Sequence, residues 1–169
     1  MTDADKPGPD KPGPGNTGTD HAGVIAHPPF LYAGALVAGA VLDWIVPLPL
    51  LAPGTGMVPG IALIAAALLL AGWCFRLFTK AGTNLPTNKP STAIVTTGPY
   101  RLSRNPIYVA LTTLSVGIAL WVNSAWMLGL IVPTLVVMTV GVIRREEQYL
   151  EAKFGDDYRS YKARVRRWL

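Results

Sequence analysis

No charged side chain occurs in residues 105–143, which read NPIYVALTTLSVGIALWVNSAWMLGLIVPTLVVMTVGVI. An α-helix needs about 20 apolar residues to cross a bilayer, so this stretch is long enough for two crossings. The short sequence WVNS, at 121–124, divides it at a point suited to a tight turn. We therefore predict a helical hairpin over residues 106–120 and 125–143. Its first helix is short for a full crossing, which predicts that it is tilted or begins in the headgroup region.

A second apolar stretch covers residues 24–75 and contains one charged residue, Asp43. It is interrupted by PLPLLAPGTGMVPG, residues 47–60, where the prolines and glycines are expected to end a helix. This pattern predicts two further membrane helices, at residues 30–46 and 58–78.

The composition supports membrane insertion. Half of the 169 residues are hydrophobic and only 15% are charged, which is too little polar surface for a soluble domain. We predict an all-α integral membrane protein with about four transmembrane helices in a single domain, residues 24–169. The first 23 residues are rich in Pro, Gly and Asp and are expected to be a disordered tail without a signal peptide.

The positive charges indicate the topology. All fifteen Lys and Arg lie in the N-terminal tail, in residues 76–104 or after residue 143. The positive-inside rule therefore predicts that both termini and the middle loop are cytoplasmic, which four crossings satisfy. The net charge of +5 fits attraction to anionic lipid better than nucleic-acid binding.

Other candidate sites are weaker. An intramembrane carboxylate such as Asp43 is a functional candidate by default, but its nearness to Trp44 and the 47–60 connection favours a structural place near the outer interface. The two histidines, His21 and His27, and the single Cys74 do not form a zinc site of ordinary spacing, so no metal is expected.

The C-terminal residues 144–169 are polar and predict a cytoplasmic amphipathic helix on the membrane surface. Gly155 followed by Asp156 could break this helix into two pieces. The helix could be an anchor only, or it could cover a site. Its apolar side chains recur at steps of three or four, the period of one helical face: Leu150, Phe154, Tyr158, Tyr161, Val165 and Trp168.

Two polar clusters are expected to meet at the cytoplasmic edge. Glu146 and Glu147 follow the fourth predicted helix, and RLSRNP, residues 101–106, precedes the third. Because these two helices form a hairpin, the clusters should lie close together and make one site.

At these residues the sequence resembles the isoprenylcysteine carboxyl methyltransferase family and its wider relatives, the membrane phospholipid methyltransferases. The resemblance covers about residues 75–168, through STAIVTTGPYRLSRNPIYVA, the WVNS hairpin and RREEQYLEAKFGDDYRSYKARV. It implies an integral membrane enzyme that transfers a methyl group from S-adenosylmethionine, bound at the cytoplasmic side without a Rossmann fold, to a lipid-like acceptor reached through the bilayer.

The resemblance also implies cofactor contacts. Arg104 and Glu147 are added to these contacts because of the charges on the methyl donor. Its carboxylate calls for hydrogen-bond donors, and its ammonium and sulfonium call for an acidic group. The tyrosines offer aromatic surface to the adenine or the sulfonium. The expected contacts are Ile94, Val95, Tyr100, Arg104, Asn105, Pro106, Ile107, Tyr108, Glu146 and Glu147.

Three positions depart from the family pattern. Asn105 stands where the family often has His, and Ala110 where it often has Gly. Val142 stands where eukaryotic members have the arginine associated with the acceptor carboxylate. Arg144 and Arg145 are therefore candidates to position the acceptor, by proximity only.

The leading hypothesis is an S-adenosylmethionine-dependent methyltransferase acting on a lipidic or apolar acceptor, with carboxyl O-methylation ahead of phospholipid amine or thiol methylation. A carboxylate acceptor needs no general base, because it is already ionised at neutral pH. The alternatives are a sterol-reductase-like enzyme that uses NADPH and a non-catalytic membrane protein. The expected partners are the bilayer and the acceptor, without nucleic acid, and the oligomeric state is open.

Overall fold

The computed structural model describes residues 23–84 and 91–169. The tail predicted for residues 1–23 therefore lies outside the described residues, apart from Gly23. The described residues form helices and connecting segments, with two isolated bridges between extended residues.

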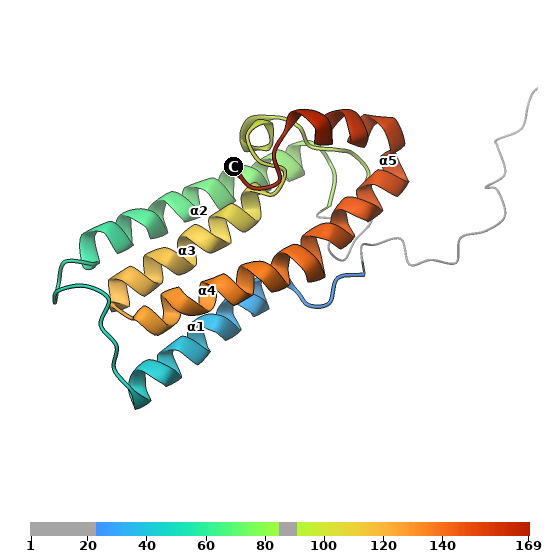
Figure 1. Ribbon diagram of the computed structural model, residues 1–169. Helices are drawn as coiled ribbons and strands as arrows, with labels where there is room; N and C mark the ends of the chain where they lie inside the picture. Colours follow the sequence, from blue (N-terminus) through green and yellow to red (C-terminus); the bar gives the residue numbers. More distant parts are fainter. Residues whose placement is uncertain (1–22, 85–90) are drawn as a thin grey trace, which may run out of the picture.

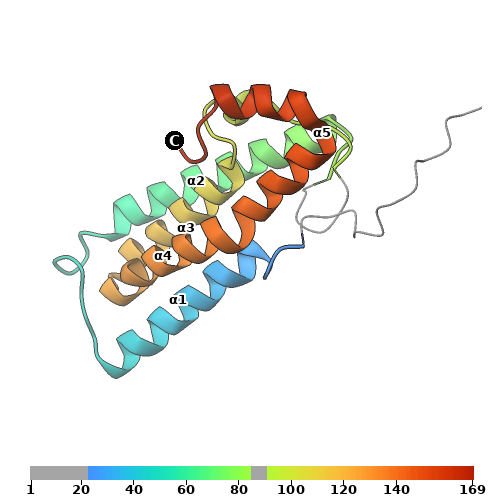
Figure 2. The same cartoon turned by 45° about the vertical axis from the view of Figure 1, so that its right-hand side comes forward.

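Four helices lie side by side in an elongated bundle (Figure 1). They are α1 (Pro28–Ile45), α2 (Met57–Lys80), α3 (Pro106–Val122) and α4 (Ala125–Met138). A π-helix, η2 (Thr139–Ile143), continues α4 into α5 (Arg144–Arg164). A short 3-10 helix, η1 (Gly98–Arg101), precedes α3. Figure 2 shows from a second side that α5 bends across the end of the bundle at which α2 ends and α3 begins; we call this the polar end.

The four predicted helical segments are present, and the ends of α1, α2 and α3 differ from the predicted ones by two residues or fewer. The segment predicted as one helix over residues 125–143 is α4 followed by the π-helix η2. Within residues 23–84 and 91–169, three continuous helices are long and apolar enough to cross a membrane: Pro28–Ile45, Met57–Lys80 and Ala125–Arg164. Pro106–Val122 is apolar but shorter. Large apolar side chains point outward, among them Trp44 and Leu69, which are 85% and 76% exposed. An outward apolar surface of this kind fits contact with lipid rather than water. The number of crossings and their direction stay predictions.

Helices α2 and α3 pack closely through glycine. A Cβ atom added at Gly60 would lie 2.7 Å from the carbonyl oxygen of Gly117, and one added at Gly117 would lie 2.9 Å from the carbonyl oxygen of Gly60. Small residues let membrane helices approach until their backbones touch, which increases van der Waals contact where no hydrophobic effect drives association. This contact fixes α3, whose first turn carries site residues, against α2.

Asp43 has a structural place at the opposite end of the bundle. Its Oδ1 accepts hydrogen bonds from the Leu48 N–H (3.3 Å) and the Ser124 hydroxyl (3.1 Å). Next to it, Asn123 adopts a left-handed conformation, and its side-chain oxygen accepts a hydrogen bond from the Leu51 N–H (2.8 Å). These bonds join the α1–α2 connection to the α3–α4 turn predicted at WVNS, and they give Oδ1 of Asp43 two hydrogen-bond donors.

The C-terminal helix differs from its prediction at the far end. It kinks at Gly155, whose φ of 53° and ψ of −123° are non-helical, as the sequence suggested. It ends at Arg164 and not at residue 169. Val165 is extended, and the chain returns to the start of α3, where the Arg104 N–H donates to the Arg166 carbonyl (2.9 Å). Trp168 packs against the core cluster instead of extending the helical face, because backbone pairing and burial together outweigh one more turn of exposed helix.

Replacing Gly60 by Ala tests the α2–α3 contact. The added methyl group meets backbone atoms, so we expect a loss of about 1–3 kcal/mol, seen as a lower melting temperature in detergent. The matched control is Gly72→Ala in the same helix, where nothing lies within 4 Å of the added carbon. Equal melting temperatures for the two variants would contradict close backbone packing.

Candidate functional site

A pocket opens at the polar end, where α5 crosses the bundle. Its empty volume is about 630 Å³, including the part open to solvent. The lining comes from the end of α2, the segment before η1, the start of α3 and both halves of α5: Phe78, Ser91, Ala93, Ile94, Val95, Tyr100, Arg104, Asn105, Ile107, Tyr108, Glu146, Glu147, Leu150, Tyr158 and Tyr161. We call it the polar pocket.

Hydrogen bonds hold the segments that form its wall. The buried Thr83 hydroxyl oxygen accepts bonds from the backbone N–H groups of Thr92 (2.9 Å) and Ala93 (3.2 Å), which fixes the start of the segment leading to η1. The Tyr161 hydroxyl donates to the carbonyl oxygen of Tyr100 (2.8 Å) and so ties the second half of α5 to η1. The pocket is thus closed on two sides by α5 and by residues 91–101.

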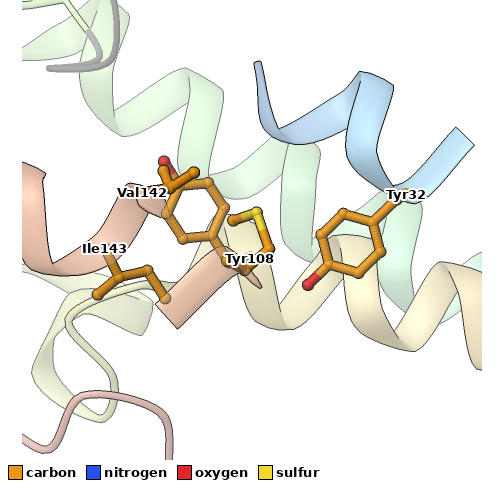
Figure 3. Packing of buried hydrophobic residues seen from close by; sticks show 5 residues of the cluster. Tyr32, Tyr108, Val142 and Ile143 are labelled. Carbon is orange, nitrogen blue, oxygen red and sulfur yellow. The ribbon is translucent and has the colours of Figure 1, made fainter. Parts of the chain in front are cut away.

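Glu146 is buried and bound by the first turn of α3. The Tyr108 hydroxyl lies 2.7 Å and 2.8 Å from the two oxygens of the Glu146 carboxylate and donates its proton to them. Tyr108 belongs to a buried cluster with Val142 and Ile143, and Figure 3 shows its ring beside these two side chains. The cluster fixes the ring, and the ring fixes the position of the carboxylate.

The π-helix decides which side of α5 faces the pocket. An α-helix advances about 100° per residue, so the extra residue of a π turn rotates all later side chains by about that angle. Glu146 and Glu147 lie three and four residues after the end of η2, and both are buried and line the polar pocket. No local sequence signal marked this turn.

Glu147 is held by two arginines. Arg167 donates from Nε and Nη2 to the two carboxylate oxygens, at 3.0 Å and 2.8 Å, in a bidentate pair. Arg104 Nη1 lies 3.1 Å from Oε1 of the same carboxylate, and the side chains of Arg104 and Glu147 are 9% and 8% exposed. The carboxylate also raises the pKa of the Arg167 guanidinium, chiefly through the hydrogen bonds. Two cations therefore surround one anion.

Arg104 carries unused hydrogen-bonding capacity. Its Nε and Nη1 atoms are buried and have no hydrogen-bond acceptor among the residues that the structure describes, although Nη1 lies within ion-pair distance of Glu147. A buried guanidinium N–H without an acceptor is costly, and such groups in native proteins usually meet a ligand or water. Arg104 lines the polar pocket, so an anionic group bound there would satisfy it.

The tyrosines of the pocket remain protonated donors. Burial raises the pKa of Tyr158 to about 12, with a further contribution from the charge of Glu147. Burial likewise raises the pKa of Tyr100 and of Tyr161 well above the ordinary value. At neutral pH these residues offer aromatic surface and hydroxyl groups, but no negative charge.

The structure brings most of the predicted contact residues together. Of the ten, all except Pro106 line the polar pocket, and Pro106 begins α3 beside it. The Asn105 side chain donates to the Arg167 carbonyl oxygen (2.9 Å). Arg144 and Arg145 are exposed and do not line the pocket; Arg145 donates instead to the Gly23 carbonyl oxygen (2.8 Å). Their proposed role in positioning an acceptor has no support from this placement.

Sequence reasoning missed several lining residues. Leu150, Tyr158 and Tyr161 were expected on the covering face of α5, but Phe154 of that face lies outside the polar pocket. Arg167 does not line the pocket but holds Glu147, and it gave no signal because it is one of several arginines near the C-terminus. Phe78, Ser91 and Ala93 also line the pocket without any motif that marked them.

A second, apolar pocket lies between α1, α2 and α3. Its empty volume is about 1110 Å³, including the part open to its surroundings. Ile107 and Tyr108 line both this pocket and the polar pocket. The rest of its lining is mostly apolar: His27, Pro28, Pro29, Ala67, Leu68, Ala71, Phe75, Asn84, Ala110, Leu111 and Leu114. We call it the apolar cleft.

Comparison with known proteins identifies the family. The phospholipid methyltransferase family model matches residues 55–157, which is more than half of the chain. The chain belongs to the phospholipid methyltransferase family. This match confirms the resemblance seen in the sequence, since the family is related to the isoprenylcysteine carboxyl methyltransferases. Phospholipid methyltransferases generally use S-adenosylmethionine.

One further protein is similar over a shorter range. An uncharacterized protein of Haemophilus influenzae is 48% identical over 64 residues, which is 37% of this chain and all of that protein. No solved structure matches the chain. The family assignment therefore rests on the family model.

Tyr108→Phe tests whether the hydroxyl stabilises the buried carboxylate of Glu146. Hydrogen bonds to charged groups contribute about 1.5–3 kcal/mol, so thermal unfolding in detergent should show a loss of this size. The matched control is Tyr32→Phe, which removes a bond of 2.7 Å to the neutral Thr112 hydroxyl and should cost about 0.5–1.5 kcal/mol. A Tyr108 variant no less stable than the Tyr32 variant would contradict the pairing.

Proposed function

We propose that this protein is an integral membrane methyltransferase that binds S-adenosylmethionine in the polar pocket and methylates a lipidic acceptor held in the apolar cleft. The observation that carries the proposal is the sharing of Ile107 and Tyr108 by the two pockets. A polar ligand and an apolar ligand can then meet across a single turn of α3.

The residues of the polar pocket fit the chemical groups of the methyl donor. Glu146 supplies negative charge for the ammonium or the sulfonium, and Arg104 has buried N–H groups that lack an acceptor and suit a carboxylate. Phe78 and Tyr100, whose rings meet edge to face at 5.6 Å, offer aromatic surface for an adenine. When bound, S-adenosylmethionine supplies a methyl carbon on a sulfonium, open to attack by a nucleophile and leaving a thioether.

In this proposal the protein acts mainly by aligning the methyl donor with the acceptor. Holding two reactants in a reactive geometry contributes roughly 7–11 kcal/mol in the best intramolecular models. The Tyr108–Glu146 bond fixes charge at the wall between the pockets, and α5 covers the polar pocket from outside. Exclusion of water by this cover strengthens the electrostatic interactions inside. The positive-inside pattern supports a cytoplasmic position for this end of the bundle.

We propose a carboxylate as the acceptor group. A carboxylate is ionised at neutral pH and needs no general base. Neither residue shared by the two pockets supplies a base, because Ile107 is apolar and Tyr108 donates its proton to Glu146. Methylation of a phospholipid amine is the second candidate, because His27 lines the apolar cleft and a neutral imidazole can accept the proton that an ammonium must lose.

An assay of methyl transfer to each candidate acceptor distinguishes these possibilities directly. The protein is reconstituted in vesicles with methyl-labelled S-adenosylmethionine and, in separate reactions, a long-chain carboxylic acid, phosphatidylethanolamine or a long-chain thiol. We expect label in a base-labile ester of the acid. Label only in the phospholipid, lost in a His27→Ala variant, would support amine methylation instead.

The donor site is tested by Glu146→Gln, which keeps the size of the side chain and removes its charge. Loss of a charge-assisted interaction of about 1.5–3 kcal/mol should weaken S-adenosylmethionine binding ten-fold or more in calorimetric titration. The matched control is Glu151→Gln on the same helix, where the carboxylate forms an outer pair with Lys162 (2.9 Å) and donor affinity should not change. Binding of NADPH in place of S-adenosylmethionine would contradict the proposal and favour a reductase.

A further inference from the structure

The last residues of the chain form a strap against Arg104 and Asn105, two residues that line the polar pocket. The strap, residues 165–169, follows α5 and pairs with the start of α3: the Arg104 N–H donates to the Arg166 carbonyl (2.9 Å), and the Asn105 side chain donates to the Arg167 carbonyl (2.9 Å). Trp168 packs against the core cluster. The strap backbone is therefore fixed on both sides of Arg167.

This backbone position brings the Arg167 side chain to Glu147. The guanidinium makes two parallel bonds to the carboxylate, the geometry in which arginine binds carboxylates most specifically. Arg104 approaches one oxygen of the same carboxylate, yet it has no hydrogen-bond acceptor for Nε or Nη1 among the described residues. Both oxygens of Glu147 are thus engaged by Arg167, and Arg104 keeps N–H groups for another acceptor.

We propose that Arg167 is a positioning residue for the methyl donor: by holding both oxygens of Glu147, it leaves the buried guanidinium of Arg104 available to the carboxylate of S-adenosylmethionine. The inference rests on the proposed function and adds a residue from the end of the chain to the donor site. Without Arg167, Glu147 would be a buried carboxylate with Arg104 as its cationic partner. Glu147 would then accept hydrogen bonds from the N–H groups of Arg104. The net charge of Arg104, Glu147 and residue 167 together would fall from +1 to zero.

A purely structural strap predicts a different result. If Arg167 only fastened the C-terminus, its loss would loosen the whole pocket and weaken every ligand alike. If it acts through Arg104, only ligands with a carboxylate should lose affinity. A pair of probes separates the two roles: S-adenosylmethionine and decarboxylated S-adenosylmethionine, which keeps the sulfonium and the amine but lacks the carboxylate.

The experiment is calorimetric titration of the full-length protein in detergent with each probe. For Arg167→Ala we expect S-adenosylmethionine affinity to fall about ten-fold, the size of one charge-assisted hydrogen bond, while affinity for the decarboxylated probe stays within about two-fold. The matched control is Arg166→Ala, which removes an exposed positive charge from the same strap and should change neither affinity. Arg167→Lys keeps the positive charge but loses the two parallel hydrogen bonds of the guanidinium. We therefore expect a smaller loss of S-adenosylmethionine affinity, again without a loss for the decarboxylated probe.

The outcomes separate this inference from the function on which it rests. A wild-type protein that binds neither probe overturns the proposed function. A wild-type protein that binds S-adenosylmethionine, with Arg167 variants that bind it equally well or lose both probes in equal proportion, overturns the role of Arg167 alone. If the Ala variant does not fold, the ratio of the two affinities in Arg167→Lys decides the question, because that variant leaves no unpaired buried charge.

Discussion

Two adjacent carboxylates, Glu146 and Glu147, are buried where an apolar helix leaves the bundle. An ionised carboxylate away from water is strongly unfavourable unless hydrogen bonds or opposite charges compensate it. Tyr108 supplies the hydrogen bond for Glu146, while Arg104 and Arg167 supply the charges for Glu147. These partners come from the first turn of α3, from Arg104 two residues before α3 begins, and from the strap. The need to compensate the two carboxylates therefore explains why separate segments converge at the polar end.

The same turn of α3 also connects the two pockets. Pro106 suits the first helical position because its missing N–H would have no partner there, and the next two residues, Ile107 and Tyr108, line both pockets. The close contact of Gly60 with Gly117 holds α3 against α2, which forms one wall of the apolar cleft. Under the proposed function, this arrangement would let a water-soluble methyl donor and a membrane-soluble acceptor meet while each stays in its own solvent.

Patterns that depend on local composition could be predicted from the sequence. The helical hairpin, the turn at Asn123, the start of α3 at Pro106 and the kink at Gly155 all follow from apolar length, helix caps and glycine. The meeting of Glu146 with the start of α3 followed from the hairpin. The π-helix, in contrast, is set by packing around η2, where Ile25 N–H donates to the Gly141 carbonyl (3.3 Å), and such long-range contacts leave no local pattern. The strap was predicted as helix because its apolar residues continue a helical period. Its pairing with residues just before α3, through the Ser103–Arg166 bridge, gives it an extended backbone instead.

The proposed function requires that the polar pocket binds the methyl donor. Its most direct test is labelling of the detergent-purified protein with a photoreactive S-adenosylmethionine analogue, followed by mass spectrometry of the labelled peptides. We expect label in residues 91–108 and 146–161, and we expect an excess of unmodified S-adenosylmethionine to remove it. Label confined to the end of α1 and the beginning of α2, away from the polar end, would contradict donor binding in the polar pocket. Label that the competitor does not remove would contradict it as well.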